Sequence, residues 1–91
     1  MSRESKRLKV KELIQEGNIK DFGEIVTIMG PTAIAGLFAS NTDIIKTRLK
    51  RPERFRLQEI YSLSEYFEVT EETMFKIIHQ LYLANKSKKK K

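Results

Sequence analysis

The central stretch of the chain, residues 31–50, carries two short apolar stripes at helical spacing. The apolar positions that form them are Ile34, Ala35, Phe38, Ile45 and Leu49. The small polar run 39–41 between the stripes is too short to be a loop of its own, so the two helices must cross at a steep angle. Ala35 and Ala39 are small enough to let the backbones approach at the crossing. The pattern therefore predicts a helix-turn-helix unit.

The segments before this pair predict two further helices. Residues 1–16 read as a basic amphipathic helix with a narrow apolar stripe, which we expect to pack only loosely. Asp21 is followed three residues later by Glu24, the spacing of a capping box, so a helix is expected to begin there. The β-branched residues that follow leave a strand as the competing interpretation. Gly30-Pro31 ends this segment and opens the next helix.

Beyond the central pair, Pro52 interrupts the periodicity, and two longer helices follow. In the first, over residues 57–69, the positions expected to face inward are Leu57, Ile60, Tyr61, Leu63, Ser64 and Phe67. The positions expected to face outward are Gln58, Glu59, Glu65 and Glu68. Thr70 is a good N-cap for the last helix, which we expect to end near Ala84. The KSKKKK run of residues 86–91 has no apolar side chain to bury and is expected to be disordered.

These elements predict an all-α protein, a five-helix bundle with an N-terminal helical extension and a disordered basic tail. The expected divisions are a basic extension over 1–19, a helical domain over 20–85 and the lysine-rich tail 86–91. The 91 residues suffice for one small domain. No apolar run is long enough to span a membrane, no secretory signal is evident and cysteine is absent. We therefore expect a cytoplasmic protein.

The net charge of +6 is unevenly distributed. Residues 1–11 hold five bases and one acid, and residues 86–91 hold five lysines, so the body of the chain, residues 12–85, is net negative. Within that body, residues 46–56 hold six bases and one acid, whereas residues 57–72 hold five acids and no base. A domain with one basic and one acidic side favours an oriented polyanion partner more strongly than the overall charge does.

Residues 21–83 resemble the lambda-repressor-like helix-turn-helix domains of phage repressors and bacterial regulators. The resemblance is one of layout: the helix pair 32–38 and 41–49, the linker Arg51-Pro52-Glu53-Arg54-Phe55, and the passage Tyr66-Phe67-Glu68-Val69-Thr70 before the last helix. Two positions depart from the family pattern. Ala39 stands where glycine is usual, and Ser40 stands where an apolar residue is usual.

The resemblance implies that residues 41–49 form the recognition helix, which lies in the major groove of double-stranded DNA. The candidate base contacts are Asn41, Thr42, Asp43, Lys46 and Thr47, with Ile44 partly covered and Ile45 and Leu49 buried. The candidate phosphate contacts are Thr32, Lys50, Arg51, Arg54 and Arg56. Structural roles compete at two positions: Asn41 also suits an N-cap, and Asp43 suits the positive first turn of a helix and would repel phosphates.

The function we expect is sequence-specific DNA binding by a small transcriptional regulator. The alternative is a helical protein-interaction module, antitoxin-like or a scaffold, without DNA function; RNA binding is weaker because no aromatic stacking platform is evident. A homodimer through the 71–84 helix, extended by Phe75 or Tyr82, is a further expectation. His79 alone makes no metal site, and no catalytic constellation is present, so we expect neither an enzyme nor a cofactor nor a small-molecule ligand.

Overall fold

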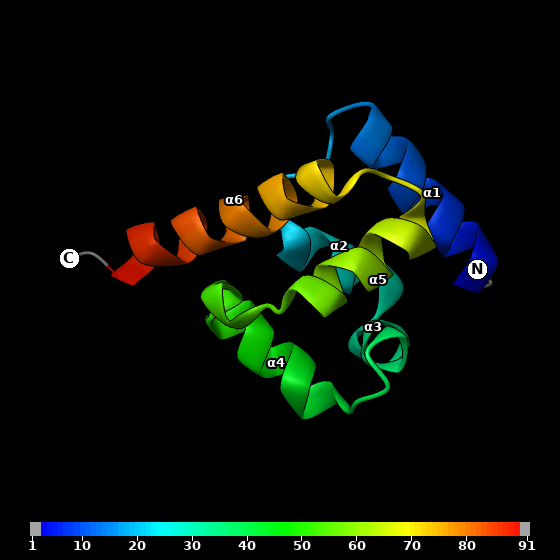
Figure 1. The fold of residues 1–91 in the computed structure, drawn as a ribbon. Helices are drawn as coiled ribbons and strands as arrows, with labels where there is room; N and C mark the ends of the chain where they lie inside the picture. The colour runs from blue at the N-terminus through cyan, green and yellow to red at the C-terminus, as the bar shows by residue number, and fades with distance from the viewer. Residues whose placement is uncertain (1–2, 90–91) are drawn as a thin grey trace.

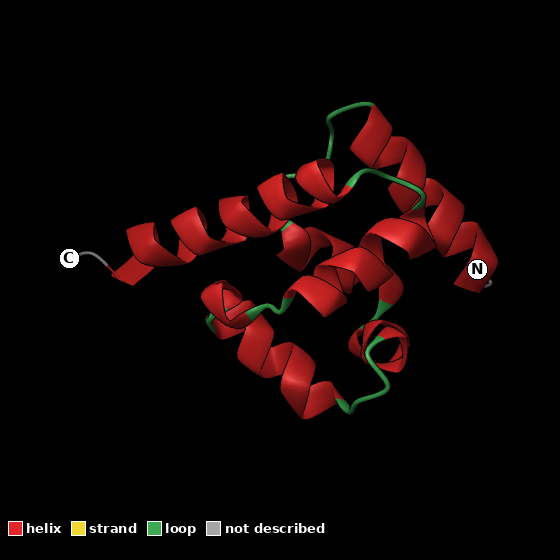
Figure 2. Cartoon of the chain, in the orientation of Figure 1, coloured by secondary structure: helices red, strands yellow, loops and turns green. Residues whose placement is uncertain are grey.

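The computed structural model describes residues 3–89 and is helical apart from short connections (Figures 1 and 2). The elements are α1 (Arg3–Gln15), α2 (Phe22–Met29), α3 (Pro31–Leu37), α4 (Thr42–Lys50), the 3-10 turn η1 (Pro52–Arg54), α5 (Leu57–Phe67) and α6 (Glu71–Lys89). No strand occurs within the described residues, so the expectation of an all-α protein is confirmed.

One hydrophobic core joins all six α-helices. It contains Val10 and Ile14 of α1, Phe22, Ile25 and Met29 of α2, Ile34 of α3, Ile45 of α4, Leu63 and Phe67 of α5, and Met74, Ile78 and Leu81 of α6. The short helix α2 lies at its centre and packs on α1, α3 and α6. Phe55, in the connection after η1, packs edge-on against Phe22 at a ring distance of 5.1 Å and against Phe38 at 6.2 Å. These ring contacts join the segment after α4 to the core.

The polar start of α2 decides between helix and strand. Asp21 Oδ1 accepts a hydrogen bond from the Glu24 amide at 3.3 Å, and the Lys20 amide donates to Glu24 Oε1 at 2.7 Å. The first bond satisfies an amide that the helix start leaves unpaired, and the second satisfies the amide just before the N-cap; the cap offsets the modest helix propensity of the β-branched residues that follow. The prediction that a helix begins at Asp21 is confirmed, and the competing strand interpretation is wrong, but Glu24 accepts from the Lys20 amide and not from the Asp21 amide, so the reciprocal bond of a capping box is absent.

Helix α1 packs more closely than we expected. Val10 is fully buried and Ile14 nearly so. The Arg7 guanidinium donates to the Tyr66 carbonyl at 3.1 Å, and Lys11 forms an ion pair with Glu68. Both polar contacts tie α1 to the C-terminal end of α5, so α1 shares the common core, and the expected loose packing is wrong.

Three expectations for α5 need correction. Leu57 and Tyr61, expected to face inward, are 69% and 52% exposed. Glu59, expected to face outward, is largely buried against Arg48. The buried side of α5 is defined instead by Ile60, Leu63, Ser64 and Phe67. The inward face is therefore narrower than predicted, and Glu59 lies at its edge, where it pairs with Arg48.

Helix α6 is longer than predicted. It continues past Ala84 to Lys89, so the disorder expected for residues 86–91 is wrong for 86–89, while residues 90–91 lie outside the described part of the chain. Lysine is a good helix former, and cations are favoured near the negative C-terminal end of a helix. With no glycine or proline after Thr70, nothing in the sequence ends the helix earlier.

Candidate nucleic-acid interface

Helices α3 and α4 are joined by a turn of four residues and cross at a steep angle (Figure 1). The Ser40 amide donates to the Ala35 carbonyl at 3.0 Å, and the Ala39 amide donates to the Gly36 carbonyl at 3.2 Å. Ala39 itself has a φ of 52°, in the left-handed region. This pair of bonds around a left-handed residue is a Schellman motif, which usually places glycine at that position. The turn thus keeps its geometry although alanine replaces the usual glycine.

Helix α4 begins with a side-chain cap. Asn41 Oδ1 accepts a hydrogen bond from the Ile44 amide at 3.2 Å, so the capping role considered for Asn41 is confirmed. The side-chain NH₂ of Asn41 is not needed for this cap, and the residue is exposed. Thr47 Oγ1 donates to the Asp43 carbonyl one turn earlier at 3.0 Å, which fixes the rotamer of an exposed threonine. Asp43 is exposed in the first turn, where its charge favours the helix dipole.

The two faces of α4 differ sharply in burial. Ile45 is completely buried, Leu49 is partly buried against the core, and Ile44 is half-buried. Of the five residues predicted to contact bases, Asn41, Asp43, Lys46 and Thr47 are exposed, and Thr42 is half-buried. Four of the five side chains are therefore accessible to a partner in solution, and the Thr42 side chain is accessible only in part.

The sequence interpretation missed a buried ion pair that holds α4 against α5. Arg48 Nε and Nη2 donate to the two carboxylate oxygens of Glu59, each at 3.0 Å. The side chains are only 9% and 12% exposed. Arg48 follows the buried Ile45 by three residues, so helical spacing alone would have placed it on the inner face of α4.

The electrostatics of Glu59 follow from that geometry. Burial disfavours the charged carboxylate, but the hydrogen bonds from Arg48 and from the Arg56 amide at 3.0 Å, together with both positive charges, hold the pKa of Glu59 below its usual value. Glu59 is therefore ionised at neutral pH. Arg48 is neutralised by this pair, which removes it from the bases that could contact DNA.

A second missed residue, Asn85 of α6, holds the other end of α4. Its side-chain Nδ2 donates to the Leu49 carbonyl at 2.7 Å and to the Lys50 carbonyl at 3.3 Å. These carbonyls belong to the last turn of α4 and have no partner within the helix. The two hydrogen bonds join residues that are 36 and 35 positions apart in the sequence. No local pattern in the sequence signals a contact over that distance.

The basic residues predicted to contact phosphates are exposed at this same end of α4. Lys50 closes the helix, and Arg51, Arg54 and Arg56 follow in and around η1. Among the described side chains, Lys46, Lys50, Arg51 and Arg54 take part in none of the ion pairs, which join other residues. Thr32 is exposed on α3. Together with Arg56, these four basic residues place five cations that form no ion pair along residues 46–56.

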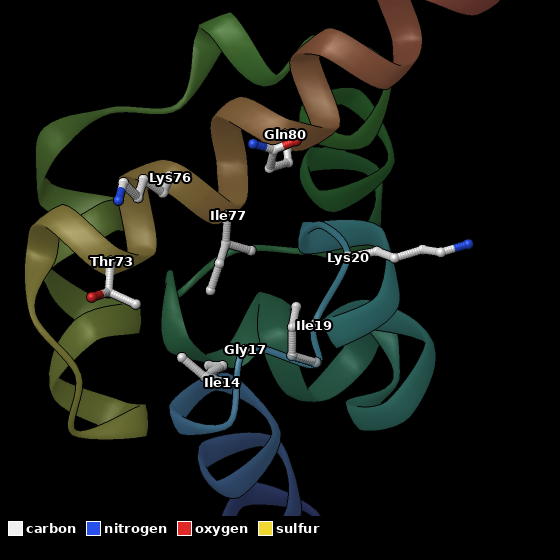
Figure 3. A pocket seen from close by; sticks show the side chains of 8 residues that line it. All are labelled: Ile14, Gly17, Ile19, Lys20, Thr73, Lys76, Ile77 and Gln80. Atoms are coloured by element: carbon white, nitrogen blue, oxygen red, sulfur yellow. The ribbon is translucent and has the colours of Figure 1, made fainter.

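The cleft shown in Figure 3 lies elsewhere, between the end of α1, the following loop and α6. Its volume is about 310 Å³, and its lining consists of Ile14, Gly17, Ile19, Lys20, Thr73, Lys76, Ile77 and Gln80. The side chains of Lys20 and Lys76 point in different directions, away from each other. The cleft shares no residue with α3 or α4, so it is separate from the candidate interface.

Other kinds of site are not evident in residues 3–89. No three histidine, cysteine or acidic side chains in this part of the chain are grouped as metal ligands would be. None of the described helices combines the length and the apolar character that a membrane crossing requires. Comparison with protein-family models, with curated proteins and with solved structures finds no match to this chain.

Proposed function

We propose that the chain binds double-stranded DNA in a sequence-specific manner, with α4 in the major groove, and acts as a small transcriptional regulator of the lambda-repressor-like kind. The observation that carries the proposal is the two-sided character of α4. One face is buried through Ile45 and fixed by Arg48, while the other presents exposed polar side chains and is followed by exposed arginines. A polar helix held rigidly on a scaffold is what major-groove recognition requires.

Each of the five side chains predicted to contact bases has a defined recognition chemistry. The free NH₂ of Asn41 suits an acceptor on adenine or a phosphate, and Lys46 suits the O6 and N7 acceptors of guanine. The carboxylate of Asp43 accepts from the amino group of cytosine, and its charge also disfavours closer approach by phosphates. The methyl groups of Thr42 and Thr47 suit the methyl group of thymine. Because Thr47 donates its hydroxyl hydrogen to the Asp43 carbonyl, its methyl group has a fixed direction.

The flanking bases supply affinity rather than sequence preference. Lys50, Arg51, Arg54 and Arg56 would each neutralise a phosphate, and each such contact contributes about −0.9 to the slope of log K against log salt. The hydroxyl of Thr32 would donate one further hydrogen bond to the backbone. We expect Arg51→Ala or Arg54→Ala to weaken binding to all duplexes alike and to make the slope less negative by about one unit.

The alternative function is a helical protein-interaction module without DNA binding. It is favoured by Leu57 and Tyr61, which are large, exposed and one turn apart on α5. Exposed apolar side chains of this kind are more typical of a protein interface than of a DNA interface. The two functions differ in salt dependence, because DNA binding weakens steeply as salt displaces phosphate contacts, whereas binding through apolar side chains such as Leu57 and Tyr61 does not.

The proposal is tested by selecting duplexes from a random pool and titrating the enriched sequence at two salt concentrations. The five lysines of residues 86–91 are replaced by glutamine, because they alone could give salt-dependent binding while deletion would shorten α6. We expect an enriched motif, and we expect the double variant Lys46→Ala/Thr47→Ala to lose the preference for it while retaining the fold.

The matched control is Lys76→Ala/Gln80→Ala, which removes the same charge from an exposed part of α6. It should leave the preference unchanged. If no sequence is enriched, or if the Lys46→Ala/Thr47→Ala variant selects the same motif as the unmodified chain, α4 does not read DNA.

A further inference from the structure

The cleft between the end of α1, the loop that follows it and α6 has an apolar middle. Ile14, Ile19 and Ile77 line it, one from each of these three segments (Figure 3). Ile14 and Ile77 are buried, and Ile19 is half-buried. The volume of about 310 Å³ is at the lower end of the range for small-molecule sites. The middle of the cleft therefore suits a short apolar body.

Thr73 adds a methyl group to this apolar middle. The Thr70 hydroxyl donates to Thr73 Oγ1 at 2.8 Å, and the Thr73 amide donates to Thr70 Oγ1 at 3.1 Å. These two bonds hold the Thr73 oxygen toward Thr70, at the start of α6. Figure 3 shows the methyl carbon of Thr73 turned to the side of the isoleucines. Thr73 thus extends the apolar lining, although it is a polar residue.

The charged side chains of the cleft are two lysines at its opposite ends. Lys20 and Lys76 leave the cleft in different directions (Figure 3). Both are exposed, and neither takes part in the ion pairs among the described residues. Of the described residues that line the cleft, none is acidic. Glu24, four residues after Lys20, accepts from the backbone amide of Lys20. Each end of the cleft therefore carries a cation that forms no ion pair.

We propose that this cleft binds a linear dicarboxylate, with its hydrocarbon middle against the isoleucines and one carboxylate at each of Lys20 and Lys76. The hydrocarbon leaves water when it enters the cleft, which favours binding. The two carboxylates stay hydrated at the rim, where the lysines attract them. A neutral chain would use neither lysine, and a chain with one carboxylate would use only one. Because the lysine stems are flexible, each ammonium can turn toward an anion without a change in the backbone.

The position of the cleft leaves α4 free. In Figure 1 the loop after α1 lies at the top of the molecule, and α4 lies at the bottom. The cleft shares no residue with α4 or with the basic residues 50–56. A bound dicarboxylate joins α1, the following loop and α6, and it stabilises the folded chain by mass action.

The test is an NMR titration of the ¹⁵N-labelled chain with suberate, octanoate and 1,8-octanediol, in the absence of DNA. The three probes share an eight-carbon chain and carry two carboxylates, one carboxylate and none. An exposed ion pair changes affinity by roughly two- to fivefold. We therefore expect suberate to bind about two- to fivefold more tightly than octanoate, and octanoate more tightly than octanediol by a similar factor. The amide shifts should lie in residues 14–20 and 73–80.

Variants separate the ends of the ligand from its middle. Lys20→Gln and Lys76→Gln should each weaken suberate binding about two- to fivefold, because each removes one cation. Ile19→Ala should weaken all three probes by a similar factor, since it shortens the wall that their common chain contacts. Lys9→Gln is the matched control, because it makes the same change at an exposed position of α1 outside the cleft. It should leave the three affinities unchanged. Circular dichroism confirms that each variant retains its helices.

The melting temperature gives a second measurement. Suberate at about ten times its dissociation constant should raise the melting temperature of the unmodified chain by about 5–10 °C, relative to sodium chloride of equal ionic strength. The same suberate concentration should raise that of Lys20→Gln/Lys76→Gln by less than half as much. Equal increases for the two chains overturn the proposal.

Three results of the titration also overturn the proposal: suberate that binds no more tightly than octanoate, lysine variants without effect on suberate binding, and shifts confined to residues outside 14–20 and 73–80. Because no DNA is present, these results are independent of the proposed DNA binding.

Discussion

Removing the cation of the Arg48–Glu59 pair should destabilise the fold more than any surface change on α4. Arg48→Met keeps most of the aliphatic stem but leaves the Glu59 carboxylate, 12% exposed, without its two hydrogen bonds of 3.0 Å. Breaking a fully buried pair costs about 3–5 kcal/mol. Glu59 retains some contact with water and the hydrogen bond from the Arg56 amide. We therefore expect a smaller loss, of about 2–3 kcal/mol in the free energy of unfolding.

The assay is urea unfolding followed by circular dichroism, applied as a double-mutant cycle. Glu59→Gln alone should cost about 1–2 kcal/mol, because Arg48 then lacks a counter-charge but keeps access to water at its edge. The double variant Arg48→Met/Glu59→Gln should recover much of the combined loss, which gives a coupling energy of about 2 kcal/mol. Strictly additive losses, or a loss below about 0.5 kcal/mol for Arg48→Met, would refute the conclusion that this pair fixes α4 on α5.

Three further outcomes are expected. Ala39→Gly should raise the melting temperature by about 2–4 °C in a thermal scan, because glycine adopts the left-handed backbone conformation without the strain of alanine, and this gain exceeds the added entropy of the unfolded chain. The control Ala33→Gly, inside α3, should lower the melting temperature. A lower melting temperature for Ala39→Gly would contradict the turn geometry. Asn85→Ala should cost about 1 kcal/mol in urea unfolding by exposing the last carbonyls of α4, and Asn85→Asp, which cannot donate, should cost more. Because the pKa of Glu59 is lowered on folding, its stabilising contribution is present above the ordinary value of 4.5 and disappears as the pH falls through the lowered pKa. The difference in stability between the unmodified chain and Glu59→Gln should therefore shrink on acidification, and a constant difference would argue against a charged pair.

Local signals predicted the elements of this fold well. The capping residues Asp21, Asn41 and Thr70 all mark helix starts in the structure, where their side chains accept from the backbone amides of Glu24, Ile44 and Thr73. The apolar spacing around Ile34 and Ile45 also identified the buried sides of α3 and α4. Caps and stripes are readable because they depend on residues within one or two turns of each other.

The errors arose where distant segments meet. Glu59 is predicted to be exposed because a carboxylate on an amphipathic helix is usually solvated. It is buried in the structure because it forms an ion pair with Arg48 of α4. Asn85 acts on α4 through a contact across the bundle. The end of α6 differs from the prediction for a different reason. The absence of apolar residues after Ala84 indicates disorder, but lysine itself favours the helix, which continues to Lys89.

The candidate site was predictable in outline only. Helical periodicity placed Lys46 and Thr47 on the outside of α4, and their exposure agrees. Sequence could not show that the turn at Ala39 keeps its geometry without glycine, because a positive φ is imposed by the hydrogen bonds of the whole turn.

The claim that α4 and its basic flank form a DNA interface is tested most directly by NMR. The ¹⁵N-labelled chain, with the lysines of residues 86–91 replaced by glutamine, is titrated with a short duplex at low salt, and the backbone amides are followed. We expect the largest shifts along α4 and residues 51–56, with smaller shifts in α3 and none along α6. Shifts confined to α1 or α6, or no shifts at low salt, would contradict DNA binding by this helix.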